Sequence, residues 1–234
     1  MFATVQGYGL NEQQHEAFSQ MRDFLFGSDR FFCLKGYAGT GKTYLIIRFI
    51  SWIIKNNPTF KIAISAPTNN AVTVLSNAAR DFGLNVDGFN LEFLTIYRLL
   101  GLKIVESDKD AERIIKDKYG EDSLSNFEVV IVDESSMLGA DLFNKITASS
   151  KRGSCQHIKW VFTGDPAQLK PVGEEISPTM KIKRSYEITQ IVRQSESNPI
   201  SDLVGLARNM VVNPENTSWN PHSEILYDKK GGVW

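Results

Sequence analysis

The chain has little cysteine and no long apolar run. Only two of its 234 residues are cysteines, Cys33 and Cys155, and they stand in very different surroundings, so we expect free thiols and not a disulfide framework. No apolar run approaches the length of a membrane span, and residues 1–9 lack the basic flank and apolar core of a signal peptide. We therefore predict a cytoplasmic protein with no membrane partner.

Net charge is almost absent as well. The formal charge of −1 argues against a protein that coats nucleic acid by bulk charge, although it leaves a local binding groove possible. Three histidines, His15, His157 and His222, show no metal-ligand spacing, so zinc is not expected. The 42% of hydrophobic residues suffices for one large or two small domains.

Residues 36–43, with the sequence GYAGTGKT, fit the G-x-x-x-x-G-K-[ST] phosphate-binding loop, or P-loop. Glycines let backbone N–H groups surround an anion, and a helix starting at about Lys42 adds the positive end of its dipole. The Lys42 ammonium would reach the β and γ phosphates, and the Thr43 hydroxyl would bind Mg²⁺. The alternative is a glycine-rich turn without a ligand. The pattern predicts a site for ATP that comprises Gly36, Ala38, Gly39, Thr40, Gly41, Lys42 and Thr43.

Short apolar runs recur along the chain and are separated by turns or helical patterns. They cover residues 31–34, 61–65, 128–132 and 159–163, and a helical pattern covers 44–54 with Arg48 and Lys55 as its solvent-facing positions. Runs that are almost wholly apolar suit a parallel sheet covered by helices on both faces. The sequence thus predicts an α/β fold of doubly wound type, whose ligands lie beyond the carboxyl ends of the strands.

A charged stretch at residues 101–127 interrupts this alternation. We interpret it as an insertion on the rim, either a short hairpin or a helix, and the alternative is a solvated connection.

Residues 131–134 form an apolar strand that ends in two carboxylates, as a Walker B site requires. Asp133 would hold Mg²⁺, and Glu134 would orient and deprotonate the attacking water. Alternatively, the two acids cap the next helix through Ser135 and Ser136.

Two further candidates follow in the chain. The Gly-Asp-Pro segment at 164–166 closes another apolar strand, and Gln168 behind it could reach the γ-phosphate or the attacking water; a plain turn is the alternative. Arg193 is a candidate for an arginine that stabilises the transition state, or else an ordinary solvated helix residue.

The order of these elements resembles that of a superfamily 1 DNA helicase of the RecD and phage Dda group, over residues 10–210. Residues 10–14 are similar to the family's Q-type motif, 66–71 to motif Ia, 95–97 to motif Ib, 132–137 to motif II and 164–172 to motif III, and Arg193 aligns with the motif IV arginine. Tyr97 stands where the family has histidine, although an aromatic ring can still stack on a base.

The resemblance implies a RecA-like P-loop NTPase that uses ATP and Mg²⁺ and has single-stranded DNA as its partner. It implies adenine recognition by Gln14, catalysis by Lys42, Asp133, Glu134, Gln168 and Arg193, and DNA contacts from Pro67, Thr68, Asn69, Thr95 and Tyr97. It also implies a motor domain at 1–185 with a small inserted subdomain at about 101–127, and the start of a second lobe or linker at 186–234.

The family's motifs V and VI are not found up to Trp234, so we expect an amino-terminal motor lobe, monomeric and slow or inactive in hydrolysis by itself. A stand-alone P-loop NTPase or kinase and a nucleic-acid-binding module that uses ATP without turnover are the alternatives. The acidic Asp133-Glu134 pair favours water as the nucleophile over a phosphate acceptor.

Overall fold

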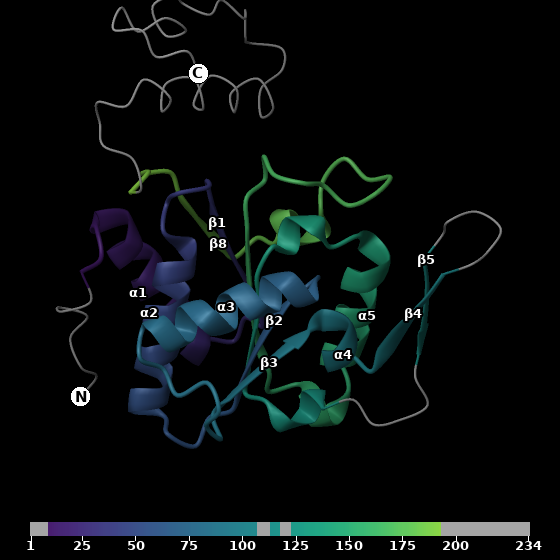
Figure 1. Ribbon diagram of the computed structural model, residues 1–234, viewed down its shortest axis with the longest axis horizontal. Helices are drawn as coiled ribbons and strands as arrows, with labels where there is room; N and C mark the ends of the chain where they lie inside the picture. Colours follow the sequence, from purple (N-terminus) through teal and green to yellow (C-terminus); the bar gives the residue numbers. More distant parts are fainter. Residues whose placement is uncertain (1–8, 107–112, 118–122, 193–234) are drawn as a thin grey trace, which may run out of the picture.

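A computed structural model describes residues 9–106, 113–117 and 123–192 (Figure 1). Its centre is a sheet of six strands in the order β3-β2-β6-β7-β1-β8, in which every neighbouring pair is parallel. The strands are β1 (Phe31–Gly36), β2 (Ile62–Ala66), β3 (Leu91–Thr95), β6 (Val129–Val132), β7 (Lys159–Gly164) and β8 (Ser185–Ile188).

Helices cover both faces of this sheet, so the predicted α/β fold is confirmed. Figure 1 shows α1 to α3 on one side of the strands and α4 and α5 on the other. The helices are α1 (Glu12–Phe26), α2 (Lys42–Asn56), α3 (Asn69–Asp81), α4 (Ile96–Leu99) and α5 (Ala140–Ser150). Short 3-10 helices, η1 (Leu124–Asn126), η2 (Ser135–Met137), η3 (Gly153–Cys155) and η4 (Pro178–Lys181), lie in the connections.

The core is divided by the sheet into two clusters. On the α1 and α2 side, Phe18 packs edge-on against Phe49 and Trp52, with ring centroids 5.6 and 5.9 Å apart. On the other side, Trp160 and Phe162 of β7 stack at 6.1 Å within the second cluster. Such pairs add about 0.5–1.5 kcal/mol each beyond the area they bury. Packing on both faces fixes the central strands, and with them the loops that leave their carboxyl ends.

The four apolar runs form β1, β2, β6 and β7 as predicted, and both cysteines are free and buried. The charged stretch contains a hairpin of β4 (Leu102–Glu106) and β5 (Arg113–Asp117), which are antiparallel and form a separate sheet. Of the two forms expected for this insertion, the described residues therefore show the hairpin. Its division into a subdomain, like the boundary at residue 185, stays a prediction.

One expectation about α2 was wrong. Lys55 is exposed as predicted, but Arg48 is half-buried, because its guanidinium lies over the rings of Tyr44 and Phe82, 4.9 and 5.4 Å from their centroids. Phe82 follows the end of α3, so this contact is between segments far apart in sequence. None of the described helices is long and apolar enough to cross a bilayer.

Candidate nucleotide site

Because the sheet is parallel, the loops after β1, β6 and β7 leave from one edge. The register places Val132 beside Phe162 and Lys35 beside Gly164, so the three loops start at nearly the same level. The predicted P-loop, Walker B acids and Gln168 all follow these strands. The topology therefore brings together loops that are far apart in the chain, with Lys42 lying 91 positions before Asp133 and 126 positions before Gln168.

The P-loop has the backbone that its glycines predict. Gly39 and Gly41 have φ values of +83° and +79°, a region that favours glycine. Gly36 ends β1 where an added Cβ would lie 2.9 Å from the Ile188 carbonyl oxygen and 3.0 Å from Thr40 Oγ1. Glycine at 36 thus permits the close approach of β8, and the two left-handed glycines turn the loop into α2.

Side chains around the loop hold its shape. Thr40 is fully buried and its hydroxyl donates to the Tyr37 carbonyl at 2.8 Å. The Lys42 ammonium donates to the Gly36 and Tyr37 carbonyls at 2.7 and 2.9 Å, so the cation lies over the loop. Gly41 is the N-cap of α2 and has no side chain that could bond the first-turn N–H groups of the helix. The remaining residues of the loop are Ala38, Gly39 and the half-exposed Thr43. This arrangement is typical of an anion site at a helix N-terminus.

Asp133 and Glu134 come directly after β6, where the Asp133 N–H continues the ladder to the Ser65 carbonyl at 2.9 Å. Burial raises the pKa of the Asp133 carboxyl above its ordinary 3.8, although the Glu134 backbone N–H, the Lys42 charge and the Thr163 hydroxyl oppose this rise. Partial desolvation of the carboxyl, and then the Asp133 charge, raise the pKa of Glu134 above 4.5. A nearby divalent cation would favour the ionised form of both carboxyls.

Glu134 has a φ of +51° and is the only non-glycine residue with positive φ among the described residues. Such a backbone costs on the order of 1 kcal/mol and often accompanies a functional position. Its side chain makes no capping hydrogen bond to η2. The structure therefore does not support the alternative in which Glu134 caps the next helix.

The Thr163 hydroxyl provides a test of whether a cation fits here. It is buried beside Asp133, yet no hydrogen bond of normal geometry engages it within the described ranges. The Asp133 carboxylate, the buried Thr163 hydroxyl beside it and the half-exposed Thr43 hydroxyl are oxygen groups of the kind that Mg²⁺ and its bound waters take as partners. The donor set therefore fits a magnesium ion, and the P-loop fits a triphosphate.

Gln168 is exposed and lines one pocket together with Glu134. The remaining lining residues come from the same two loops: Ser136, Met137, Ala167, Leu169 and Lys170. Asp165, for which the sequence predicts no individual role within the 164–172 segment, is 1% exposed and links the loops. Its carboxylate accepts the Ala38 N–H at 3.0 Å and the Ala167 N–H at 2.9 Å, while its carbonyl closes a turn with the Gln168 N–H.

Gln14 was expected to recognise adenine, but both ends of its side chain are bonded within the protein. It is buried, its amide nitrogen donates to the Thr40 carbonyl at 3.0 Å, and its oxygen accepts the Asn11 N–H in the capping box of α1. Adenine recognition by Gln14 would require some of these bonds to be exchanged, and it stays a prediction. Arg193 lies outside the described residues.

The predicted DNA contacts lie at the carboxyl ends of β2 and β3, which pair Ala66 with Thr95. Thr68 and Thr95 are the N-caps of α3 and α4, where their hydroxyls accept the Ala71 and Arg98 N–H groups at 3.2 and 3.3 Å. Pro67 and the exposed Asn69 flank Thr68, whereas Tyr97 is half-buried against the second core cluster. Tyr97 therefore offers less of its ring for stacking than the sequence indicates.

This parallel sheet, its P-loop and its paired acids define a P-loop NTPase with a RecA-like fold. Residues 9–214 match the family model described as an AAA domain, and the chain belongs to that family. The chain is 30% identical over 225 residues to RecBCD enzyme subunit RecD of Buchnera aphidicola subsp. Schizaphis graminum. The aligned region covers 86% of this chain and 34% of that relative. It is also 30% identical over 207 residues to the ATP-dependent DNA helicase dda of Enterobacteria phage T4, and this alignment covers 86% of this chain and 43% of the helicase.

Among solved structures, the Pif1 helicase from Candida albicans matches with a TM-score of 0.58 and 20% identity, covering 86% of this chain and 44% of that one. This likeness shows the fold. The chain spans less than half the length of these curated relatives. Together the findings show a RecA-like domain of the AAA-domain family that is similar to RecD and to the Dda helicase, which belong to superfamily 1.

Proposed function

We propose that the chain is the amino-terminal motor domain of a DNA helicase or translocase, which couples ATP hydrolysis to movement along single-stranded DNA. The observation that carries this proposal is the shared edge of the sheet. The candidate nucleotide site follows β1, β6 and β7, and the polar loops that resemble DNA-binding motifs follow β2 and β3 at the same edge. The relatives named as a RecD subunit and a DNA helicase support the choice of DNA.

In this proposal the backbone N–H groups of the P-loop and the Lys42 ammonium bind the phosphates of ATP. Lys42 has to leave the Gly36 and Tyr37 carbonyls that it now contacts, or share them with the phosphates. Thr43 and Asp133 would hold Mg²⁺, directly or through water. The metal ion would supply positive charge that neutralises the oxygens of the transferred phosphoryl group.

Glu134 is proposed as the base that orients and deprotonates the attacking water. Its raised pKa makes it a better proton acceptor than an ordinary glutamate, provided that it is ionised at working pH. Gln168 opens into the same pocket, from which its amide can orient the water or contact the γ-phosphate. Arg193 is proposed as the transition-state arginine from its place in the sequence.

For the DNA strand, we propose hydrogen bonds from Thr68, Asn69 and Thr95 to phosphates, with Pro67 and Tyr97 packing against the sugar and base. Such contacts are independent of base sequence. Each of the two threonine hydroxyls accepts a helix N–H and so keeps its own O–H free to donate.

The first test is ATP hydrolysis with and without single-stranded DNA, measured on this chain and on a version extended to the length of the helicase relatives. We expect a large DNA-stimulated rate in the extended protein and slow or no turnover in the 234 residues. Glu134→Gln in the extended protein should still bind ATP and DNA but lose hydrolysis by at least about 10²-fold.

Turnover that does not respond to DNA in either protein would favour a stand-alone NTPase. Nucleotide binding without turnover in both would favour a binding module. Either result would contradict the proposed motor.

A further inference from the structure

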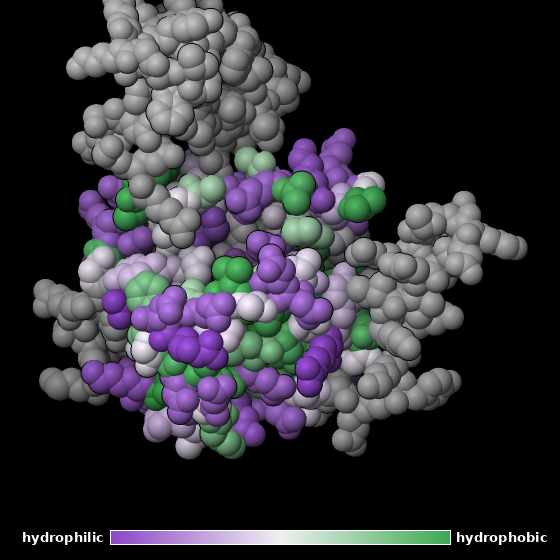
Figure 2. Space-filling model, in the orientation of Figure 1, coloured by the Kyte–Doolittle hydropathy of each residue, from purple (hydrophilic) through white to green (hydrophobic). Residues whose placement is uncertain are grey.

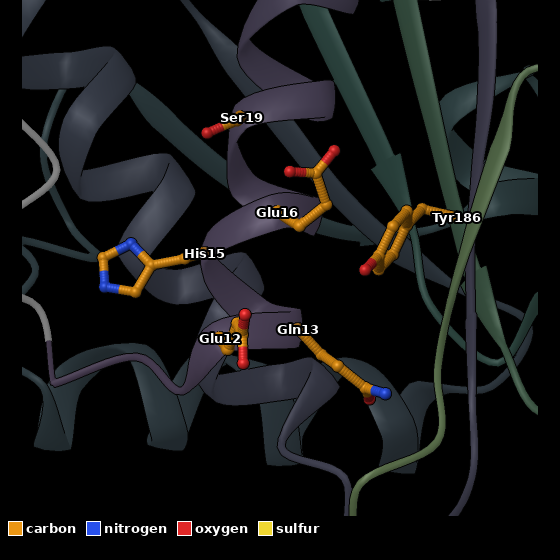
Figure 3. A pocket seen from close by; sticks show the side chains of 6 residues that line it. All are labelled: Glu12, Gln13, His15, Glu16, Ser19 and Tyr186. Atoms are coloured by element: carbon orange, nitrogen blue, oxygen red, sulfur yellow. The ribbon is translucent and has the colours of Figure 1, made fainter.

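The first turn of α1 carries two adjacent glutamines that face different partners. Gln14 contacts the P-loop through Thr40, as described above. Gln13 instead reaches the chain that continues from β8, 176 residues away. Its side-chain oxygen accepts the N–H groups of Thr189 and Gln190, both at 2.9 Å, and its amide nitrogen donates to Thr189 Oγ1 at 3.1 Å. In Figure 3 the Gln13 side chain extends from α1 toward this chain, at one end of the pocket that Tyr186 also lines.

These bonds replace a missing strand partner. β8 is at the edge of the described sheet and ends at Ile188, so the ladder with β1 provides no partner for the next two N–H groups. Thr189 and Gln190 are exposed, and without Gln13 their backbone would exchange hydrogen bonds with water. One side chain therefore keeps two residues beyond the strand in an ordered path.

We call residues 188–192 the exit segment. It contacts the P-loop at both of its ends: the Ile188 carbonyl accepts the Tyr37 N–H at 3.4 Å, and the Val192 N–H donates to the Gly39 carbonyl at 2.9 Å. Gly39 has a left-handed backbone, and a glycine can change its backbone angles at little cost. A rotation of its peptide plane on phosphate binding would change the orientation of this carbonyl. Gln13 fixes the middle of the segment whose ends contact the nucleotide loop.

We infer that Gln13 is a positioning residue, which holds the exit segment against the P-loop so that the presence of nucleotide there is transmitted to the chain beyond β8. The inference rests on the proposed function for its nucleotide, but the positioning itself does not require it. The two neighbouring glutamines then have separate tasks: Gln14 supports the loop that binds phosphate, and Gln13 supports the segment that responds to it.

Hydrogen exchange across the exit segment tests this inference in the 234-residue protein, with and without Mg·ADP. In Gln13→Ala, the amides of Thr189, Gln190 and Val192 should exchange about five- to tenfold faster than in the wild type without nucleotide, as expected for the loss of exposed hydrogen bonds. Mg·ADP should slow exchange of the segment in the wild type and much less in the variant. Nucleotide affinity should change less than the exchange rates, because the described side-chain bonds of Gln13 go to Thr189 and Gln190 and not to the P-loop.

Two variants serve as controls. Gln13→Glu keeps an oxygen for both N–H groups and can accept from the Thr189 hydroxyl, so its exchange should stay within about twofold of the wild type. Gln20→Ala removes a glutamine of the same helix whose only described bond is local, to Glu16, and should leave the exit segment unchanged. The capping box of Asn11 and Gln14 remains in all variants, so α1 keeps its start.

Unchanged exchange of the exit segment in Gln13→Ala would overturn the positioning role. Tight Mg·ADP binding without any protection of the segment in the wild type would overturn the transmission. Absence of nucleotide binding in the wild type would instead contradict the proposed function, and the nucleotide-free comparison of variants would still decide whether Gln13 positions the segment.

Discussion

The two halves of the sheet's carboxyl edge are built in different ways. After β1, β6 and β7, which we call the phosphate end, backbone groups face the candidate ligand and buried side chains such as Thr40 and Asp165 hold that backbone. After β2 and β3, which we call the strand end, exposed or half-exposed side chains cap helices and face solvent. The phosphate end is held by hydrogen bonds of buried side chains within the protein, whereas the strand end depends on side chains that can be replaced with little effect on the fold.

The largest difference between the two ends should appear on substitution of a glycine. Gly41→Ala places a side chain at φ +79° with its Cβ 2.6 Å from Gln14 Nε2, so it adds backbone strain and displaces the Gln14 bond to Thr40. We expect a loss of about 2–4 kcal/mol in the free energy of unfolding and at least about tenfold weaker nucleotide binding. Chemical denaturation and titration with a fluorescent nucleotide measure the two effects.

Gly83→Ala is the matched control, because Gly83 has the same backbone region, φ +78°, but no atom within 4 Å of an added Cβ. It should cost only about 1 kcal/mol and leave nucleotide binding unchanged. Equal losses in the two variants would show that the packing of Gln14 on the P-loop contributes nothing.

A medium effect is expected from Asp133→Asn, and it depends on pH. The folded-state pKa of Asp133 lies above its ordinary 3.8, so the folded protein binds this proton more strongly than the unfolded chain does. The stability from that proton is fully present below pH 3.8 and is lost as the pH rises through the raised pKa. At neutral pH the ionised carboxylate therefore costs stability, and Asp133→Asn should raise the free energy of unfolding there while Mg²⁺-dependent nucleotide binding falls.

Unfolding curves between pH 3 and pH 7.5, recorded without Mg²⁺, measure this difference. The gain from Asp133→Asn should shrink toward acid pH, and Asp87→Asn, at an exposed position, should show no comparable gain. A variant less stable than the wild type at neutral pH would mean that hydrogen bonds to the Asp133 carboxylate outweigh its burial.

The smallest effects should come from the strand end. Thr68→Ala removes the cap of α3 and should cost about 1 kcal/mol of stability. Thr68→Asp keeps a capping oxygen and so should keep the stability, but its charge opposes a DNA phosphate and should weaken single-stranded DNA binding several-fold. Anisotropy titrations with a labelled oligothymidine at two salt concentrations measure the binding, and unchanged affinity in Thr68→Asp would remove Thr68 from the DNA contact.

The sequence predicted the central part of the fold better than its edges. β2 and β6 are buried at every position, so their apolar runs were evident. The edge strands β3 and β8 have mixed burial and were not recognised, since only two residues of β3 and one of β8 are fully buried and neither strand shows a continuous apolar run.

The candidate site shows the same limit. The P-loop glycines are where the pattern predicts them, because a left-handed backbone restricts the residue type so strongly. The roles of Asp165 and Gln13 depend on partners 127 and 176 residues away, and no local pattern encodes such distances. Asp165 comes almost directly after an apolar strand, which is a signal for a functional acid. Only the order of the strands in the sheet reveals that its carboxylate binds the Ala38 N–H of the P-loop.

The burial of both cysteines has a practical consequence for spectroscopy. Burial raises the pKa of the Cys33 thiol to about 12, and Cys155 is only 1% exposed, so neither offers an accessible thiolate to a maleimide at neutral pH. A single cysteine introduced at an exposed position such as Asn69 would then be the one site that takes a fluorophore or spin label. The native chain can thus serve as its own cysteine-light background for following the strand end during nucleotide turnover.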